Sequence, residues 1–128
     1  MALLRDVLYV ACGGAAGCVL RYLVSLGVAQ CIRHPFPWAT LLVNVLGCFL
    51  IGLLSGLGAP GGPLELRHRL ILLTGFCGGF TTFSTFSLEM LTLAQSGRYG
   101  SLGLYLAGSV TLGVLAVLGG LATARGIA

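Results

Sequence analysis

Four long apolar runs, separated by short polar or proline-rich connections, most limit what this chain can fold into. The runs cover about residues 4–30, 38–58, 68–95 and 99–124. A helix that crosses a bilayer needs about 20 apolar residues, so each run is long enough to span a membrane. Short connections make consecutive helices antiparallel neighbours. The sequence therefore predicts an all-α membrane protein with four transmembrane helices in a single domain, residues 1–128.

The composition excludes a water-soluble domain and a nucleic-acid-binding protein. Of the 128 residues, 57% are hydrophobic and only 8% are charged, which is too few to cover a folded surface in water. The formal net charge is +4, but the arginines stand singly at the ends of the apolar runs and form no basic patch. We expect the lipid bilayer as a partner and no nucleic acid.

The arginines also bear on the orientation of the chain in the membrane. With four spans, both termini lie on one side. That side carries Arg5, Arg67, Arg69 and Arg125, and the other side carries Arg21, Arg33 and Arg98. Orientation follows the imbalance of Lys and Arg between short loops. Because the two sides are almost balanced, the sequence permits both orientations.

Small residues recur at four-residue spacing within the runs. The pairs are Gly13 with Gly17, Gly52 with Gly56, Gly75 with Gly79, Ser109 with Gly113 and Ala116 with Gly120. Such pairs let membrane helices approach closely, although glycine is common in membrane helices in any case. We expect close helix packing at these positions.

One stretch of the third run, residues 75–87 (GFCGGFTTFSTFS), differs from a plain apolar span. Three glycines in five residues each lower helix propensity by roughly 1 kcal/mol relative to alanine. The next eight residues carry five hydroxyl groups interleaved with three phenylalanines. We expect the third helix to be broken here, at mid-membrane.

Polar residues from all four spans converge toward one side of the membrane. At 1.5 Å per residue, Asn44 lies about 9 Å below the start of the second span. The other polar members of the group are Arg21, Glu89 and Ser109, and the phenylalanines Phe83 and Phe86 lie beside them. Because polar groups inside a bilayer are costly, their convergence predicts a polar vestibule on this side.

Several of these residues also have a purely structural explanation. Arg21 can extend toward the membrane surface as an anchor, and Asn44 can hydrogen-bond a neighbouring helix. Ser84 and Thr85 can bond back to carbonyls of their own helix. The functional interpretation rests on their occurrence together, at one depth, beside a glycine-rich stretch.

The chemistry of the group favours a small anion that accepts strong hydrogen bonds. The edge of a phenyl ring is positive, and Phe83 and Phe86, three residues apart, share a helix face. Asn44 supplies N–H donors, and the short hydroxyl side chains can rotate to donate. This chemistry does not determine which anion is bound.

The chain resembles the CrcB or Fluc family of fluoride channels over all four spans. The motifs that carry the resemblance are Gly13-Gly14-x-x-Gly17-x-x-x-Arg21-Tyr22, Thr40-Leu41-x-Val43-Asn44-x-x-Gly47 and Gly75-Phe76-x-Gly78-Gly79-x-Thr81-Thr82-Phe83-Ser84-Thr85-Phe86, followed by Glu89. The third motif is long and specific. Cys18 and Ala39 depart from the family, which often has alanine and glycine there.

The resemblance implies an antiparallel, dual-topology homodimer with two pores. It would export fluoride passively across the bacterial inner membrane and so relieve fluoride toxicity. Asn44, Phe83 and Phe86 would line the pore, and Ser84 and Thr85 would form a hydroxyl track. With the matching fourth-span serine and the vestibule residues, the expected ion path comprises Asn44, Phe83, Phe86, Ser84, Thr85, Ser109, Glu89 and Arg21.

The resemblance further implies a structural sodium ion, held by the backbone carbonyls of Gly78 and Thr81 at the dimer axis. In an antiparallel dimer only residues at mid-depth meet their own copies, and the apolar part of the third span, Leu70 to Leu88, has its midpoint at residue 79. We expect the consecutive glycines to unwind the helix there and to free its carbonyls. A bound cation would offset the cost of unpaired carbonyls in hydrocarbon.

Two other protein classes fit less well. A small four-span multidrug or cation carrier of dual topology has the same size, but it needs a membrane-embedded acid in its first span, and no acid occurs between Asp6 and Glu65. An intramembrane hydrolase that used Ser84 would need a base within reach, and His34 and His68 lie in loops on opposite sides. We therefore expect a channel without catalytic residues, not an enzyme.

Overall fold

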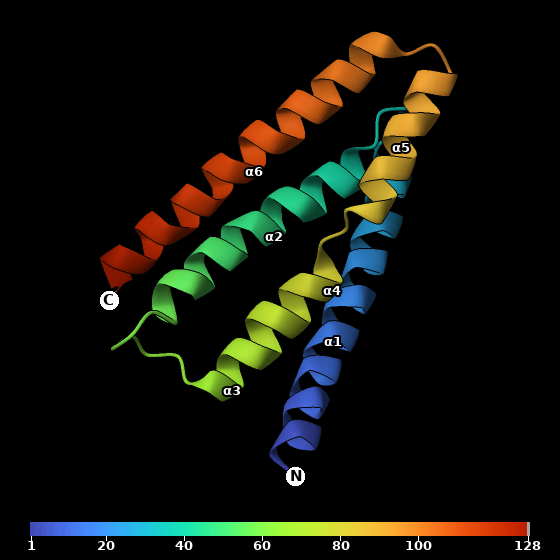
Figure 1. Cartoon of the computed structure of the whole chain (residues 1–128). Coiled ribbons are helices and arrows are strands. Elements are labelled where there is room, and N and C mark those ends of the chain that lie inside the picture. Colours follow the sequence, from blue (N-terminus) through green and yellow to red (C-terminus); the bar gives the residue numbers. More distant parts are fainter. Residues whose placement is uncertain (128) are drawn as a thin grey trace.

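The computed structural model describes residues 1–127, which are almost entirely helical (Figure 1). Its elements are α1 (Ala2–Cys31), α2 (Trp38–Leu57), α3 (Leu66–Arg69), the π-helical η1 (Leu70–Cys77), α4 (Gly78–Phe80), α5 (Ser84–Gln95) and α6 (Tyr99–Ile127). Elements α3 to α5 follow one another as a third long stretch, Leu66–Gln95. All four stretches are long and apolar enough to cross a membrane, which confirms the prediction of four helical spans.

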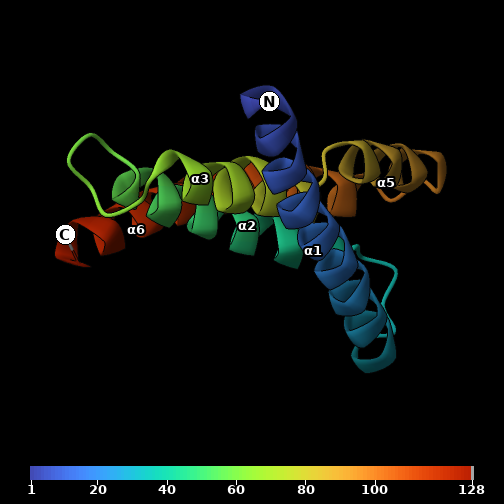
Figure 2. The same ribbon diagram turned by 90° about the horizontal axis from the view of Figure 1, so that it is seen from below.

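The four stretches form two closely packed pairs. Helix α2 packs along α6, and α1 packs against η1 and α4, while contacts between the pairs are fewer. Successive stretches run in alternating directions (Figure 1). Seen from below, α1 crosses the layer of the other helices at a steep angle (Figure 2). The result is an open arrangement rather than a closed four-helix bundle.

Close packing within each pair depends on glycine. Gly13 of α1 lies so near the carbonyl oxygen of Ile71 in η1 that a β-carbon would collide with it. Gly52 of α2 meets the carbonyl oxygen of Val117 in α6 in the same way. Small residues at such positions let helix backbones come together without a side chain between them. These two members of the four-residue pattern therefore lie at helix–helix contacts.

Gly97 makes the sharp turn between α5 and α6. Its φ of +73° is in the left-handed region, where glycine has no steric penalty. The N–H of Gly97 donates to the carbonyl of Ala94 (3.1 Å), and the N–H of Arg98 donates to the carbonyl of Leu93 (2.9 Å). This pattern is a Schellman motif. It ends α5 and lets α6 begin at Tyr99, at the same end of the molecule.

Helical geometry in the third stretch stops between α4 and α5. Gly78 keeps helical angles, φ −62° and ψ −38°, and the chain becomes extended at Thr81, with ψ 161°. The expected unwinding at Gly78 is therefore wrong in position. The glycines pack against α1, where a β-carbon on Gly79 would meet the Gly14 carbonyl oxygen, and this contact is compatible with a wound helix. Residues 81–83 leave the helix instead.

Candidate functional site

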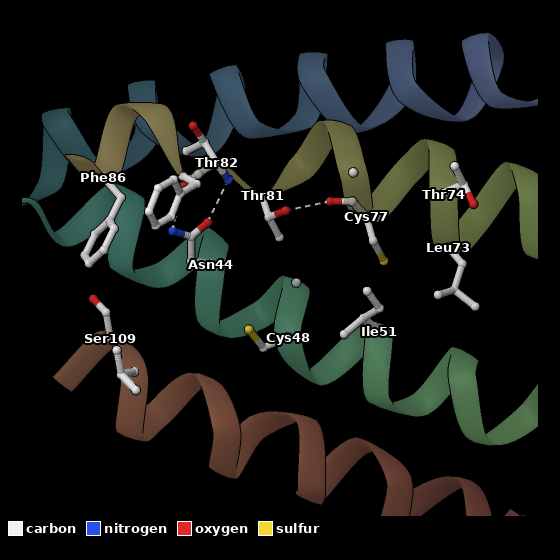
Figure 3. A pocket seen from close by; sticks show the side chains of 14 residues that line it. Asn44, Cys48, Ile51, Leu73, Thr74, Cys77, Thr81, Thr82, Phe86 and Ser109 are labelled. Atoms are coloured by element: carbon white, nitrogen blue, oxygen red, sulfur yellow. Dashed lines mark hydrogen bonds between the residues drawn. The ribbon is translucent and has the colours of Figure 1, made fainter. Parts of the chain in front are cut away.

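A cavity of about 620 Å³ lies between α2, the third stretch and α6 (Figure 3). Its lining residues are Asn44, Gly47, Cys48 and Ile51 from α2, Leu73, Thr74, Cys77, Gly78, Thr81, Thr82, Phe83 and Phe86 from the third stretch, and Ser109 and Val110 from α6. Four of the predicted ion-path residues are thus brought together: Asn44, Phe83, Phe86 and Ser109. Arg21, Ser84, Thr85 and Glu89 do not line this cavity.

Asn44 holds the interruption of the third stretch with two hydrogen bonds. The N–H of Thr82 donates to Oδ1 of Asn44 (2.8 Å), and Nδ2 of Asn44 donates to the Thr82 carbonyl (2.9 Å). Figure 3 shows the Asn44 amide pointing toward Thr82. In an uninterrupted α-helix the Thr82 N–H would instead donate to the carbonyl of Gly78. Asn44 therefore takes over this donor and leaves the Gly78 carbonyl without its usual helical partner.

Arg21 secures the same interruption from α1. Its Nε donates to the carbonyl of Gly79 (3.0 Å), a group that would accept the Phe83 N–H if the helix continued. Such a bond from a charged donor is stronger than one between neutral groups. The Arg21 side chain thus points toward the interrupted helix. It does not extend toward the membrane surface as an anchor, which was the alternative that the sequence left open.

The two phenylalanines of the predicted path lie close together but differ in burial. The ring centroids of Phe83 and Phe86 are 6.0 Å apart, with planes tilted by 51°. Phe86 is only 7% exposed and meets the ring of Tyr105 edge to face, with centroids 4.8 Å apart. Phe83 is 78% exposed on this chain. One ring is therefore fixed in a small core, and the other lies at the open rim of the cavity.

Ser109 has a buried hydroxyl without a partner. Its Oγ is inaccessible and makes no hydrogen bond to any group in residues 1–127. A buried hydroxyl left unpaired costs about 1–3 kcal/mol. Ser109 lines the cavity, so a rotation of its side chain would be needed to bring this hydroxyl to a small polar solute or ion there.

Glu89 forms a hydrogen-bonded pair with Tyr105. The Tyr105 hydroxyl donates to Oε1 of Glu89 (3.0 Å), and Tyr105 is fully buried. Tyr105 is not among the site residues predicted from the sequence. A tyrosine inside an apolar span was a usable signal, because a buried phenol generally needs a hydrogen-bond partner.

Ser84 and Thr85 lie at the start of α5, outside the cavity lining. Ser84 is exposed, and the backbone N–H of Thr85 donates to the hydroxyl of Thr82 (3.2 Å). Neither the Ser84 nor the Thr85 hydroxyl makes a hydrogen bond within the described part of the chain. A hydroxyl track through these two residues stays a prediction.

Gly78 and Thr81, the predicted sodium ligands, both line the cavity. The Gly78 carbonyl has lost its helical donor to Asn44, and Thr81 is extended, so its carbonyl leaves the helical direction. The Thr81 hydroxyl donates to the carbonyl of Cys77 (2.9 Å). Carbonyl oxygens are hard donors that suit hard cations. The donor chemistry therefore fits a cation such as sodium.

The fold and the site together define a class: a small multi-pass membrane protein whose helices surround an apolar cavity with a few hydrogen-bonding groups. A family model described as "CrcB-like protein, Camphor Resistance (CrcB)" matches residues 8–121. The chain belongs to this family.

Several curated relatives match almost the whole chain. A protein of Rhizobium johnstonii is 47% identical over 123 residues, which cover 96% of this chain and 98% of the relative. Relatives from Nitrobacter winogradskyi and Prosthecochloris aestuarii are each 46% identical over 119 residues, with 93% of this chain covered and 94% and 92% of the relatives. All three are named "Fluoride-specific ion channel FluC".

Proposed function

We propose that this protein is a fluoride-specific ion channel that lets fluoride leave the cell passively across the inner membrane and so relieves its toxicity. The observation that carries the proposal is the grouping of Asn44, Phe86 and Ser109 around one cavity, in a chain that belongs to the CrcB-like family. A channel of this kind is not an enzyme and needs no catalytic residue.

The donors of the cavity suit a small anion. The amide of Asn44 has two N–H groups; one binds the Thr82 carbonyl, and the other is available to an ion. The buried Ser109 hydroxyl is unpaired and would donate after a rotation of its side chain, and the positive edges of Phe83 and Phe86 add weak attraction. Conduction needs binding that is strong enough for entry and weak enough for release. Several neutral donors meet this requirement better than a fixed cation.

The apolar walls raise the cost of entry for every ion, so selectivity depends on the hydrogen-bond donors. Ile51, Leu73 and Val110 line the cavity beside the polar groups, so an ion that enters loses much of its water. Only an anion that recovers strong hydrogen bonds from the few donors present can offset this loss. Fluoride, a small and strong acceptor, fits these conditions.

We further propose that two copies associate in antiparallel orientation, with two pores. The cavity is open toward the outside of the single chain, where Phe83 is largely exposed, and a second copy would cover it. The near balance of arginines between the two sides supports insertion in both directions. In a variant that lacks the five native cysteines, a single engineered cysteine in the 32–37 loop should react with an impermeant reagent in only part of the copies in intact vesicles, and in the remaining copies after the vesicles are permeabilised. Labelling from one side alone would contradict dual topology.

A sodium ion at the Gly78 and Thr81 carbonyls would be structural and would not be transported. When bound, it would satisfy carbonyls that the interruption leaves without helical donors. Replacement of sodium by N-methylglucamine should then lower the unfolding temperature of the purified protein, independently of flux. An unchanged unfolding temperature would contradict this site.

A four-span multidrug or cation carrier is not favoured. Such a carrier needs an acid inside its first span, and that span has none between Asp6 and its end. The curated relatives are named as fluoride channels.

Fluoride efflux from liposomes that contain only this protein tests the proposal. A fluoride electrode should record rapid release down a fluoride gradient, and a chloride electrode should record no release above that of empty liposomes. Equal release of both ions, or none of fluoride, would contradict the function.

A further inference from the structure

A second cavity, of about 410 Å³, lies where α1 ends and α2 begins. Its lining residues are Ser25, Val28, Ala29 and Ile32 from the end of α1, Arg33, His34, Pro35, Phe36 and Pro37 from the connection, and Trp38 and Ala39 from the start of α2. In Figure 2 this end of α1 and its connection extend away from the layer of the other helices. None of these residues belongs to the proposed ion path.

The length of α1 and the position of Trp38 indicate that this second cavity lies at the membrane surface. Helix α1 has 30 residues, about 45 Å at 1.5 Å per residue, which exceeds a hydrocarbon core of about 30 Å. The end of α1 therefore reaches the depth of the lipid headgroups. Trp38 is 43% exposed at the first residue of α2, and tryptophan is enriched at this depth.

The second cavity offers a cation and a directed N–H donor. Arg33 is exposed. The backbone N–H of Phe36 donates to Nδ1 of His34 (3.1 Å), so in the neutral ring the proton is on Nε2, which remains free to donate. The Ser25 hydroxyl is already used, because it donates to the carbonyl of Arg21 (3.0 Å).

No acidic side chain competes for Arg33. The sequence has three acidic residues, and all three have other partners: Asp6 lies beside Arg5, Glu65 beside Arg67, and Glu89 accepts from Tyr105. None of them lines the second cavity. The site therefore has positive charge, and it lacks any group that would pair with a ligand's ammonium.

We propose that this cavity binds the phosphodiester of an anionic phospholipid whose headgroup has no ammonium group, such as phosphatidylglycerol. Arg33 forms charge-assisted hydrogen bonds with the phosphate, and Nε2 of His34 donates a further one. Ile32, Phe36 and Trp38 contact the glycerol and the first methylenes of the acyl chains. Phosphatidylethanolamine is bound less well, because its ammonium finds no carboxylate here.

Native mass spectrometry of the purified full chain tests this proposal. The protein in detergent is mixed with phosphatidylglycerol or phosphatidylethanolamine of identical acyl chains, and the lipid-bound fraction is compared. A single arginine near anionic lipid changes affinity by about fivefold. Phosphatidylglycerol binding should therefore fall by about fivefold in Arg33→Gln, whereas the matched Arg98→Gln variant, which changes the other arginine-bearing connection on the same side, should bind as the unmodified protein does.

His34→Asn serves as a second, milder variant. Asparagine keeps an acceptor where Nδ1 accepts from Phe36 and removes Nε2, so the connection folds while one phosphate donor is lost. Its binding should lie between those of the unmodified protein and Arg33→Gln. Equal binding of the two lipids, or equal losses in Arg33→Gln and Arg98→Gln, would overturn the proposal. Displacement of phosphatidylglycerol by millimolar inorganic phosphate would also overturn it, since the site would then bind a free anion.

Discussion

At the scale of single residues, Asn44 holds the interrupted helix and, in the proposed function, also donates to the ion. Its amide bonds to both the N–H and the carbonyl of Thr82, and it also lines the cavity with an N–H to spare. The sequence left open whether Asn44 packs helices together or contacts an ion. The structure explains how one side chain can hold the interrupted helix and still present a donor.

The Asn44→Asp variant separates these roles. A carboxylate keeps the acceptor for the Thr82 N–H, but it loses the donor and adds negative charge beside the proposed ion path. An anion 4 Å from a unit charge is repelled by about 4 kcal/mol at an effective dielectric constant of 20, so fluoride efflux should fall by more than about tenfold. Size-exclusion chromatography checks that the variant is folded. Undiminished efflux at neutral pH would restrict Asn44 to holding the helix.

Phe83 and Phe86 should respond differently to isoleucine. Both substitutions remove a positive ring edge, so both should strongly reduce fluoride efflux. Phe86→Ile should also lower the unfolding temperature more than Phe83→Ile does, because Phe86, unlike Phe83, packs edge to face on Tyr105, a contact worth about 0.5–1.5 kcal/mol. Phe49→Ile, in α2 away from the cavity lining, is the control. Normal efflux in both path variants would remove the rings from the mechanism.

At the scale of elements, the third stretch carries the site because its helix is interrupted and held from two sides. The sequence predicted the spans and showed that the composition of this stretch is unusual. It did not predict where the chain leaves the helix, because that position depends on Asn44 of α2 and Arg21 of α1, which are 38 and 58 residues away in sequence. Glycine lowers helix propensity, but contacts with other helices decide the outcome.

Arg21 variants test how the interruption is held. Arg21→Lys keeps the charge but loses Nε, whereas Arg21→Gln loses the charge. If the bond to the Gly79 carbonyl is what matters, both variants should lose about 1.5–3 kcal/mol of unfolding free energy, seen as a lower unfolding temperature. A lysine variant as stable as the unmodified protein would show that the specific position of Nε is not required.

Two glycines of α6 provide a matched test of helix packing. A β-carbon on Gly120 would collide with the carbonyl oxygen of Phe49 in α2, whereas a β-carbon on Gly103 would meet open space. Gly120→Ala should therefore destabilise the protein by about 1–3 kcal/mol. Gly103→Ala should be neutral or stabilise by up to about 1 kcal/mol, through helix propensity. Similar unfolding temperatures in both variants would contradict the close α2–α6 contact.

At the scale of the whole molecule, the two helix pairs enclose a cavity that stays open on one side. The lengths of the apolar runs and of their connections were sufficient to predict four alternating spans. They could not predict the separation of the pairs, because that depends on which backbones approach at Gly13 and Gly52. The open side, the balanced arginines and the exposed Phe83 together support a functional unit larger than one chain.

Fluoride selectivity is the central claim, and a reversal-potential measurement tests it most directly. The purified protein is placed in a planar bilayer with sodium fluoride on one side and sodium chloride at equal concentration on the other. We expect a current whose reversal potential moves strongly toward the fluoride equilibrium potential, and which disappears when chloride replaces fluoride on both sides. A reversal potential near zero, or a current that persists in symmetrical chloride, would contradict the account.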